Sequence, residues 1–379
     1  MAGIYLDRAR ELRSLIDENA TKSEGLPIPP ETVNALVDAE LHKVMVPAAV
    51  GGLEIPVNDC IDIWSEISRA DGSVGWCLMA SCAATAYFAA WCPDEHVNRM
   101  FADGVPLSAG QFAPNGTATP DGDGFRIKGR YSFGSGINHA QWAGAGVLTV
   151  EPEGVDPRYL FAIYPVEKAR ITGNWEVMGL QATASYDYTL EDVFVPATAT
   201  FDMFNLTVHR GGPLYKLGVM PLTAAGHAGF AIGVVRRGLD ELYSVARSKQ
   251  RMGDATMLAQ NERFVHEIGE LESRFRAARG WLHETFATAE RTVGDTGEVD
   301  PMDVILTRQA TVFVTQEGAD ILRRAYLLAG TDALRSGGLQ RAFRDIHAGT
   351  QHIFAGTGPA LELGRALLDT APDNPLDAP

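Results

Sequence analysis

The spacing of hydrophobic and polar positions divides the chain into a helical region, a β-rich region and a second helical region. In the first hundred residues, apolar side chains recur at helical spacing, as at Leu12, Leu15 and Ile16. This spacing is typical of amphipathic helices. From about Leu107 the period changes to short segments rich in β-branched and aromatic residues. Helical patterns return from about residue 215 and continue to about residue 370.

The middle region predicts an all-β domain that ends near Pro196. Its apolar segments are separated by Gly, Asp and Pro turns, such as the DGDG sequence at 121–124, and such turns are typical of hairpins. The five predicted strand segments are FRIKGRYSF, GAGVLTV, YLFAIYPV, ARITGNWEV and SYDYTLEDVFV.

The last region predicts an antiparallel helical bundle, because it has long helical patterns with few breakers. These patterns cover residues 215–250, 255–290, 301–330 and 335–370. The predicted fold class is therefore α+β. The expected domains are an N-terminal helical domain, a central β domain and a C-terminal bundle, at residues 1–106, 107–203 and 204–379. The final PDNPLDAP sequence is predicted to be a frayed end.

The run from Val74 to Cys92 has nineteen residues without a charge and raises the question of a membrane span. Its small residues, a predicted helix cap at Ser73 and the absence of flanking Lys or Arg favour a helix buried inside a protein.

Composition excludes several classes of partner and site. A net charge of -16 and a pI near 5.0 disfavour nucleic acid and anionic membranes, which need clustered Lys and Arg. Four cysteines without CxxC spacing, and an N-terminus without a signal-peptide core, are typical of a cytoplasmic protein. The chain has no GxGxxG, Walker or GxSxG motif and no metal-ligand spacing, so a Rossmann, P-loop, hydrolase or metal site has little support.

Titratable side chains gather between Leu339 and Leu363, where Arg344, Asp345, His347 and His352 occur within nine residues. A histidine that faces a cavity can transfer protons near neutral pH. A histidine that faces packing is only part of the core, and the segment alone leaves both interpretations open.

The β region contains motifs that resemble the acyl-CoA dehydrogenase fold. They are GRYSFGSG at 129–136 with His139 and Trp142, and WEVMGL at 175–180 with Thr183, Ser185, Asp187 and the DVFVP sequence at 192–196. Arg251, Gly253 and Gln260 extend the likeness into the bundle. The resemblance implies an acyl-CoA dehydrogenase-like fold with a central β-barrel or sandwich, a four-helix bundle, and a flavin between them.

Two chemistries of that fold can be separated by the C-terminal segment. The dehydrogenases usually carry a base glutamate before a Gly-Thr pair, to remove a proton next to a thioester. Here Ala355 precedes Gly356, and the alternative alignment supplies Ile353. Glu362 lies well beyond, so the dehydrogenase interpretation lacks its base.

The chain is more similar to the two-component flavin-dependent monooxygenases (group D) of the superfamily. The similarity lies in GRYSFGSG, in Ala329-Gly330-Thr331, and in a histidine eight residues after Arg344. It implies an oxygenase component that receives FMNH2 or FADH2 from a separate NAD(P)H:flavin reductase and uses O2 as co-substrate. Through a flavin C4a-hydroperoxide it would hydroxylate an aromatic or polycyclic small molecule.

The same resemblance implies residue roles. His352 and Ser135 are the expected catalytic residues, His352 with an ordinary pKa near 6.5 and Ser135 near flavin N5. Flavin contacts are expected from Gln111, Phe112, Ser135, Gly136 and Thr183, with Arg251 at a phosphate, and no metal is expected. The expected substrate pocket is formed by Trp76, Met79, Tyr87 and Phe88, although these could equally be core residues.

One departure from the family is the absence of a histidine in the helix 75–91, where related monooxygenases often have one near the substrate. A homotetramer is expected, because the family packs its bundles together and shares flavin sites across that interface. Two alternatives stay open: a flavin-dependent acyl-CoA dehydrogenase, and a non-catalytic oligomeric interaction protein of the same fold.

Overall fold

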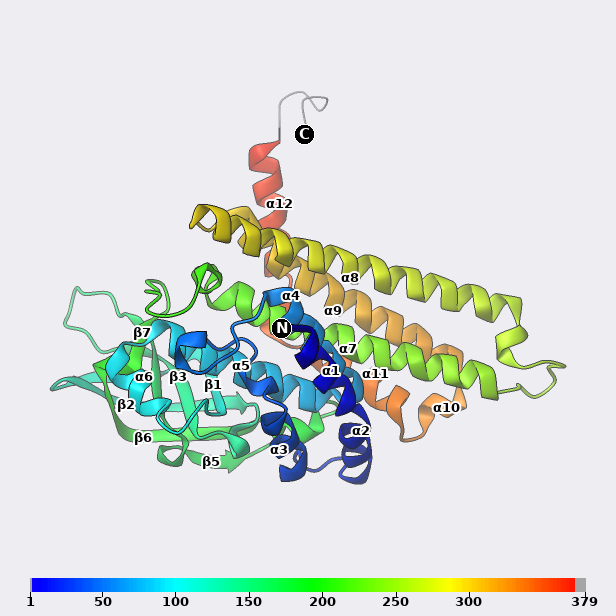
Figure 1. Cartoon of the computed structure of the whole chain (residues 1–379), viewed down its shortest axis with the longest axis horizontal. Coiled ribbons are helices and arrows are strands. Elements are labelled where there is room, and N and C mark those ends of the chain that lie inside the picture. The colour runs from blue at the N-terminus through cyan, green and yellow to red at the C-terminus, as the bar shows by residue number, and fades with distance from the viewer. Residues whose placement is uncertain (1, 372–379) are drawn as a thin grey trace.

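The computed structural model describes residues 2–371 and has the predicted order of helices, strands and helices (Figure 1). The predicted frayed tail at 372–379 lies outside the described residues. The N-terminal helices are α1 Ala2–Glu11, α2 Arg13–Lys22, α3 Pro30–Asp38, α4 Val57–Ala70, α5 Gly72–Trp91 and α6 Asp94–Met100. The C-terminal helices are α7 Val219–Ser248, α8 Glu262–Thr296, α9 Pro301–Ala329, α10 Thr331–Leu334, α11 Gly338–Gly349 and α12 Gly358–Thr370.

The strands form one mixed sheet in the order β5-β6-β2-β1-β3-β4-β7. Their bounds are β1 Ser108–Asp121, β2 Gly124–Gly134, β3 Trp142–Thr149, β4 Tyr159–Pro165, β5 Arg170–Gly173, β6 Tyr186–Pro196 and β7 Thr200–Asp202. Each neighbouring pair is antiparallel except β1 with β3. The sheet has its own apolar core, separate from that of the helices.

Each of the five predicted segments overlaps a strand, but β1 and β7 were not among them. β1 holds Pro114, Asn115, Gly116 and Pro120, residues that are depleted in strands, and its pairing with β3 shifts register between Gln111 and Gly116. Because the described strands all fall within 108–202, we propose the domain division 1–106, 107–203 and 204–379.

Helix α5 runs through the centre of the molecule and contacts β1 on one side and α7 on the other (Figure 1). Its N-cap is Asp71 rather than the predicted Ser73. The Asp71 carboxylate accepts hydrogen bonds from the backbone N–H groups of Ser73 and Val74, at 3.0 and 3.1 Å. A carboxylate at this position also interacts favourably with the helix dipole, so Asp71 is a better cap than Ser73.

Two helices, α5 and α7, are long and apolar enough to cross a membrane. In the structure 83% and 89% of their apolar windows are buried within the protein. Their apolar residues therefore face the protein core.

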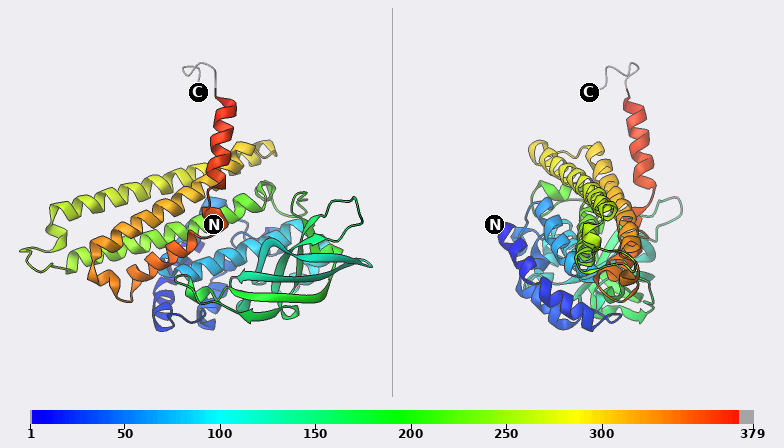
Figure 2. Two further views of the ribbon diagram at one scale, coloured as in Figure 1. Left: turned by 180° about the vertical axis from the view of Figure 1, so that it is seen from behind. Right: turned by 90° about the vertical axis from the view of Figure 1, so that its right-hand side faces the viewer.

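Helix α7 packs closely against α4 and α5 because glycines form the contact face. A Cβ atom at Gly226 would lie 2.9 Å from the Met79 sulfur, and one at Gly233 would lie 2.2 Å from the Ser65 carbonyl oxygen. This packing fixes the side chains of α7 that face α5. Helix α12 contacts α9 at its base and projects outward from the bundle (Figure 2).

The helix predicted over 335–370 is instead α11, a short 3-10 turn η9 at Ile353–Ala355, and α12. Gly349 ends α11, and Gly356 and Gly358 flank the next turn; glycine is a poor helix former. His352 therefore lies in a bend between helices and not on a helix face.

Asp345 on α11 links the bundle to the β domain. Its buried carboxylate accepts a hydrogen bond of 2.7 Å from the Leu180 N–H. Burial, together with the nearby Asp71 carboxylate, raises the pKa of Asp345 to about 7. The nearby Arg341 binds Asp71 at 3.2 Å.

We expect Asp345→Asn to stabilise the protein more at pH 8 than at pH 5. The folded pKa lies above the ordinary value of 3.8, so the wild type loses stability as pH rises from about 4 to 7. The asparagine oxygen still accepts the Leu180 hydrogen bond, and the expected gain in Tm at pH 8 is roughly 2 to 5 °C.

Thermal melts at both pH values provide the measurement, with Asp320→Asn as control. The arginine partners of Asp320 hold its pKa below 3.8, so its substitution should have the same effect at pH 5 and pH 8. A gain for Asp345→Asn that does not depend on pH would contradict the prediction.

Candidate functional site

Ser135 lies in the turn after β2 and binds side chains from two other segments. Its Oγ accepts a hydrogen bond of 3.1 Å from Trp76 Nε1 on α5. It also shares a hydrogen bond of 2.8 Å with Ser185 Oγ, which lies 2.7 Å from Thr183 Oγ1. The N–H of Gly136 donates to the Thr183 carbonyl at 3.2 Å. The turn after β2 and the residues that precede β6 are thereby joined into one polar cluster.

His352 meets this cluster through the Trp76 ring. The two rings make an edge contact, with centroids 5.3 Å apart and planes at 87°. A second histidine, His227 on α7, stacks on His352, with ring centroids 5.3 Å apart and planes at 20°. Phe354 also stacks on His352, with centroids 5.3 Å apart. Segments that are far apart in the sequence therefore meet at Trp76, Ser135 and His352.

The surroundings of His352 fix its protonation state. The Phe354 N–H donates to His352 Nδ1 at 3.5 Å, so the neutral ring carries its proton on Nε2. Although the residue is only half-buried by surface area, its ring lies among aromatic rings, and this desolvation lowers the pKa to about 4. The expectation of a pKa near 6.5 is therefore wrong, because it took no account of burial.

Three residues around the Ser135 cluster have left-handed backbone conformations although they carry side chains. Phe133, Leu180 and Ala184 have φ angles of 64°, 57° and 43°. Such conformations cost of order 1 kcal/mol or more each and concentrate at functional sites. Gly136, at φ 70°, takes the same conformation without strain.

The other predicted contacts lie elsewhere. Phe112 on β1 packs against Tyr87 and Phe161, and Gln111 accepts a hydrogen bond from Asn115. Arg251 lies in the loop between α7 and α8, at the end of the bundle farthest from the sheet (Figures 1 and 2), where it donates to the Leu328 carbonyl.

The four predicted pocket residues divide into two groups. Trp76 is part of the cluster just described, and Met79 packs against α7 at Gly226. Tyr87 and Phe88 are fully buried: Tyr87 stacks on Trp91 and binds Thr223, and Phe88 packs against Phe161. The packing of Tyr87 and Phe88 is that of core residues.

Comparisons with known proteins agree with this arrangement. Residues 225–356 match the family model described as acyl-CoA dehydrogenase, C-terminal domain. A pigment production hydroxylase of Rhodococcus sp. is 29% identical over 98% of both chains. An indole-3-acetate monooxygenase of Pseudomonas putida is 28% identical over 86% of this chain and 83% of its own. The chain is a flavin-dependent monooxygenase with the acyl-CoA dehydrogenase fold.

A solved structure confirms the fold of this monooxygenase. XiaF from Streptomyces sp., in complex with FADH2 and glycerol, superimposes with a TM-score of 0.89 over 99% of this chain and 97% of its own, at 19% identity.

The polar cluster of this monooxygenase fits a flavin ring. Ser135 keeps a hydroxyl at a half-buried position, next to the strained backbone of Phe133. The exposed Phe133 and the half-buried Trp175, whose centroids are 6.1 Å apart, add aromatic surface beside it. Hydroxyl groups and aromatic faces of this kind are what a planar heteroaromatic ring with polar edges needs.

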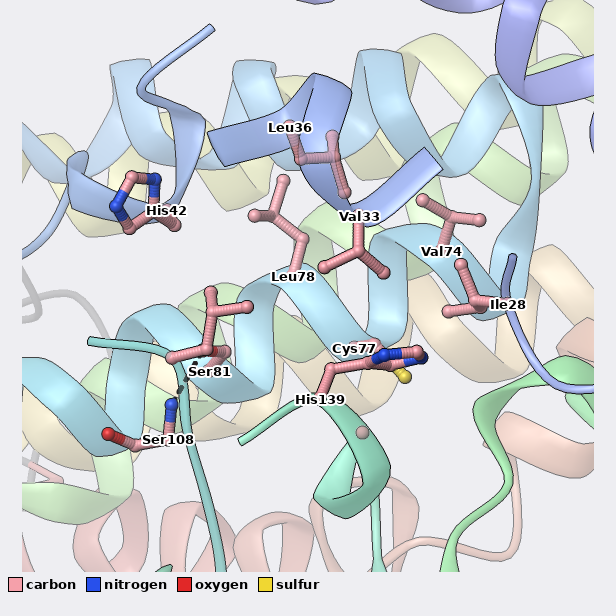
Figure 3. Close-up of a pocket in the computed structure, with 12 residues that line it drawn as sticks. Ile28, Val33, Leu36, His42, Val74, Cys77, Leu78, Ser81, Ser108 and His139 are labelled. Atoms are coloured by element: carbon pink, nitrogen blue, oxygen red, sulfur yellow. Dashed lines mark hydrogen bonds between the residues drawn. The ribbon is translucent and has the colours of Figure 1, made fainter. Parts of the chain in front are cut away.

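A cavity of about 40 Å³ lies beside α5 and borders the turn that holds Ser135 (Figure 3). It is lined by Val74, Cys77 and Leu78 of α5, by residues of α3, and by Gly136 and His139. None of the four predicted pocket residues lines it. Since α5 turns Trp76 and Met79 toward α7 and Cys77 toward this cavity, the helix has two distinct faces.

Sequence reasoning missed Ser185 and His227 as site residues. Ser185 was noted only as part of a motif. His227 interrupts a long apolar run of α7 between Val219 and Val235, and a lone histidine in such a run is the signal that could have identified it.

Proposed function

We propose that Ser135 and His352 flank the reactive part of a reduced flavin and that His352 donates its Nε2–H there. The single observation that carries this proposal is that Trp76 joins both residues, at 3.1 Å from Ser135 Oγ and 5.3 Å from the His352 ring. The chain is an oxygenase component that uses reduced flavin and O2 to oxygenate an aromatic small molecule. A separate flavin reductase is its partner.

Reduced flavin supplies the electrons and the site at which O2 reacts. The residues of this chain hold and shield that site. Ser135, fixed by Trp76 and Ser185, presents a hydroxyl whose direction is set before any ligand arrives. His352 presents a neutral N–H donor among aromatic rings, where water is excluded and hydrogen bonds are strong. Both properties favour oxygen transfer to substrate over loss of hydrogen peroxide.

We further propose that Gly136 and Thr183 form the backbone cradle beside Ser135, and that Gln111 and Phe112 contact the flavin edge. Trp76 and Met79 line the substrate side, with Tyr87 and Phe88 behind them. The contacts of Gly136 with Thr183, and of Trp76 with Ser135, support the assignments of Gly136, Thr183 and Trp76.

The geometry disfavours a dehydrogenase. Ile353, at one aligned position of the base, is 72% exposed, and Ala355 carries no functional group. The Glu362 carboxylate lies on α12, where Arg308 of α9 binds it at 2.5 Å. No carboxylate is therefore available at either aligned position for removal of a proton next to a thioester.

We infer a homotetramer in the cytoplasm without membrane association. Arg251 supports the assembly: it lies far from Ser135 in its own chain, so it could reach a flavin phosphate only in a partner. Sedimentation of the purified protein should give a mass of four 40.9 kDa chains; a monomeric mass would contradict the assembly.

The test of the function is anaerobic titration with FMN and FAD in both redox states, followed by mixing with O2 and an aromatic substrate. Reduced flavin should bind at least about tenfold tighter than oxidised flavin, and an oxygenated product should form. Tight binding of oxidised FAD with dye reduction by an acyl-CoA would favour the dehydrogenase. Failure to bind either flavin would favour the non-catalytic alternative.

A further inference from the structure

His227 is a fully buried histidine whose two ring nitrogens both lack a hydrogen-bond partner. Within residues 2–371 it is the only buried histidine for which both ring nitrogens lack a partner, since His42 and His96 each have one unpaired ring nitrogen. Buried polar groups in native proteins are generally hydrogen-bonded, and an unpaired one costs about 1–3 kcal/mol. His227 therefore has hydrogen-bonding capacity that the protein itself does not use.

The neighbours of His227 are aromatic rings. It stacks on His352 and makes edge contacts with Trp76 at 5.3 Å and Phe230 at 5.9 Å. Gly226, the preceding residue, packs closely against Met79, which holds this part of α7 against α5. His227 is thereby fixed where α5, α7 and the His352 bend meet, on the face of α5 that carries the proposed substrate residues.

The ring of His227 is neutral, because its burial and the nearby His352 lower its pKa well below 6.5. A neutral imidazole has one N–H donor and one acceptor nitrogen. The acceptor of His352 is already used by the Phe354 N–H, so that ring offers only a donor. His227 is consequently the histidine of the pair with a free acceptor.

We propose that His227 accepts a hydrogen bond from the aromatic substrate, and that the preferred substrates are aromatic rings with a hydroxyl or a ring N–H. The proposal rests on the oxygenase function and adds the class of substrate. His352 donates toward the flavin, and His227 orients the substrate through its polar group. A substrate without such a group leaves the acceptor unpaired and binds more weakly.

The test is calorimetric binding of matched ligands to the anaerobic complex with reduced flavin. The pairs are indole with 1-methylindole and phenol with anisole, which differ in the N–H or O–H group. Wild type should bind at least one parent compound about tenfold or more tighter than its methylated partner. His227→Phe, which keeps an aromatic ring but has no acceptor, should bind both members of the pair equally.

His227→Gln, which retains an acceptor oxygen, should recover part of the preference and serves as the second variant if His227→Phe does not fold. His96→Phe is the control, because His96 is also buried with an unpaired ring nitrogen but contacts Trp142 instead. An unchanged preference in both His227 variants, an equal loss in His96→Phe, or no binding of either pair would overturn the proposal. If reduced flavin itself does not bind, the oxygenase function fails instead.

Discussion

Replacing His352 with alanine is expected to lower product formation by about a hundred-fold or more, the usual contribution of a positioned proton donor or acceptor. The substitution removes the Nε2–H donor next to Trp76 and leaves a space that water can enter. Flavin should still be reoxidised, with more of the oxygen released as hydrogen peroxide. The measurement is the ratio of oxygenated product to hydrogen peroxide, each determined per flavin oxidised. The prediction requires this ratio to fall in His352→Ala.

The matched control is His347→Ala. His347 lies five residues earlier, but its Nδ1 binds the Phe343 carbonyl of its own helix at 2.7 Å, and its substitution should change this ratio by less than about twofold. Similar ratios in the two variants would mean that His352 has no special role.

The pH dependence follows from the lowered pKa of His352. The required neutral ring is present above pH of about 4, so this group should not limit activity between pH 5 and 8. Since its ordinary pKa is 6.5, its burial contributes stability above that value, and this contribution is lost as pH falls from 6.5 to about 4.

Replacing Ser135 with alanine is expected to lower the share of oxygen that reaches the substrate by about ten- to a hundred-fold. Removal of one preorganised hydrogen-bonding group commonly has effects of this size or larger. The loss has two physical sources: the hydroxyl itself disappears, and the buried Trp76 N–H loses its acceptor. Affinity for reduced flavin, together with the ratio of product to peroxide, provides the measurement.

Ser185→Ala separates these sources. It removes the hydroxyl that binds Ser135 at 2.8 Å but leaves Ser135 and its bond from Trp76 in place. We expect a smaller effect than for Ser135→Ala. If the two variants behave alike, Ser135 acts only through the polar cluster and not through direct contact with the flavin.

The strands and helices were largely predictable because their signals are local. FRIKGRYSF and YLFAIYPV alternate or concentrate β-branched and aromatic residues, and each overlaps a strand of the structure, β2 and β4 respectively. β1 was missed because its Pro and Gly residues oppose strand formation, and only its pairing with β2 and β3 compensates. The helix cap was misassigned to Ser73 for a similar reason: both residues can cap, and the backbone around Asp71 decides between them.

The sequence by itself determined the order of the regions and the buried character of α5. These follow from periodicity and composition, which are properties of neighbouring residues, whereas the roles of Ser135 and His352 were expected only from the resemblance to the flavin-dependent monooxygenases. Only the tertiary structure decided that Trp76 joins Ser135 to His352, that burial keeps His352 neutral, and that His227 stacks on it. Contacts between residues so distant in the chain depend on how helices and strands pack, and desolvation depends on everything that surrounds a group.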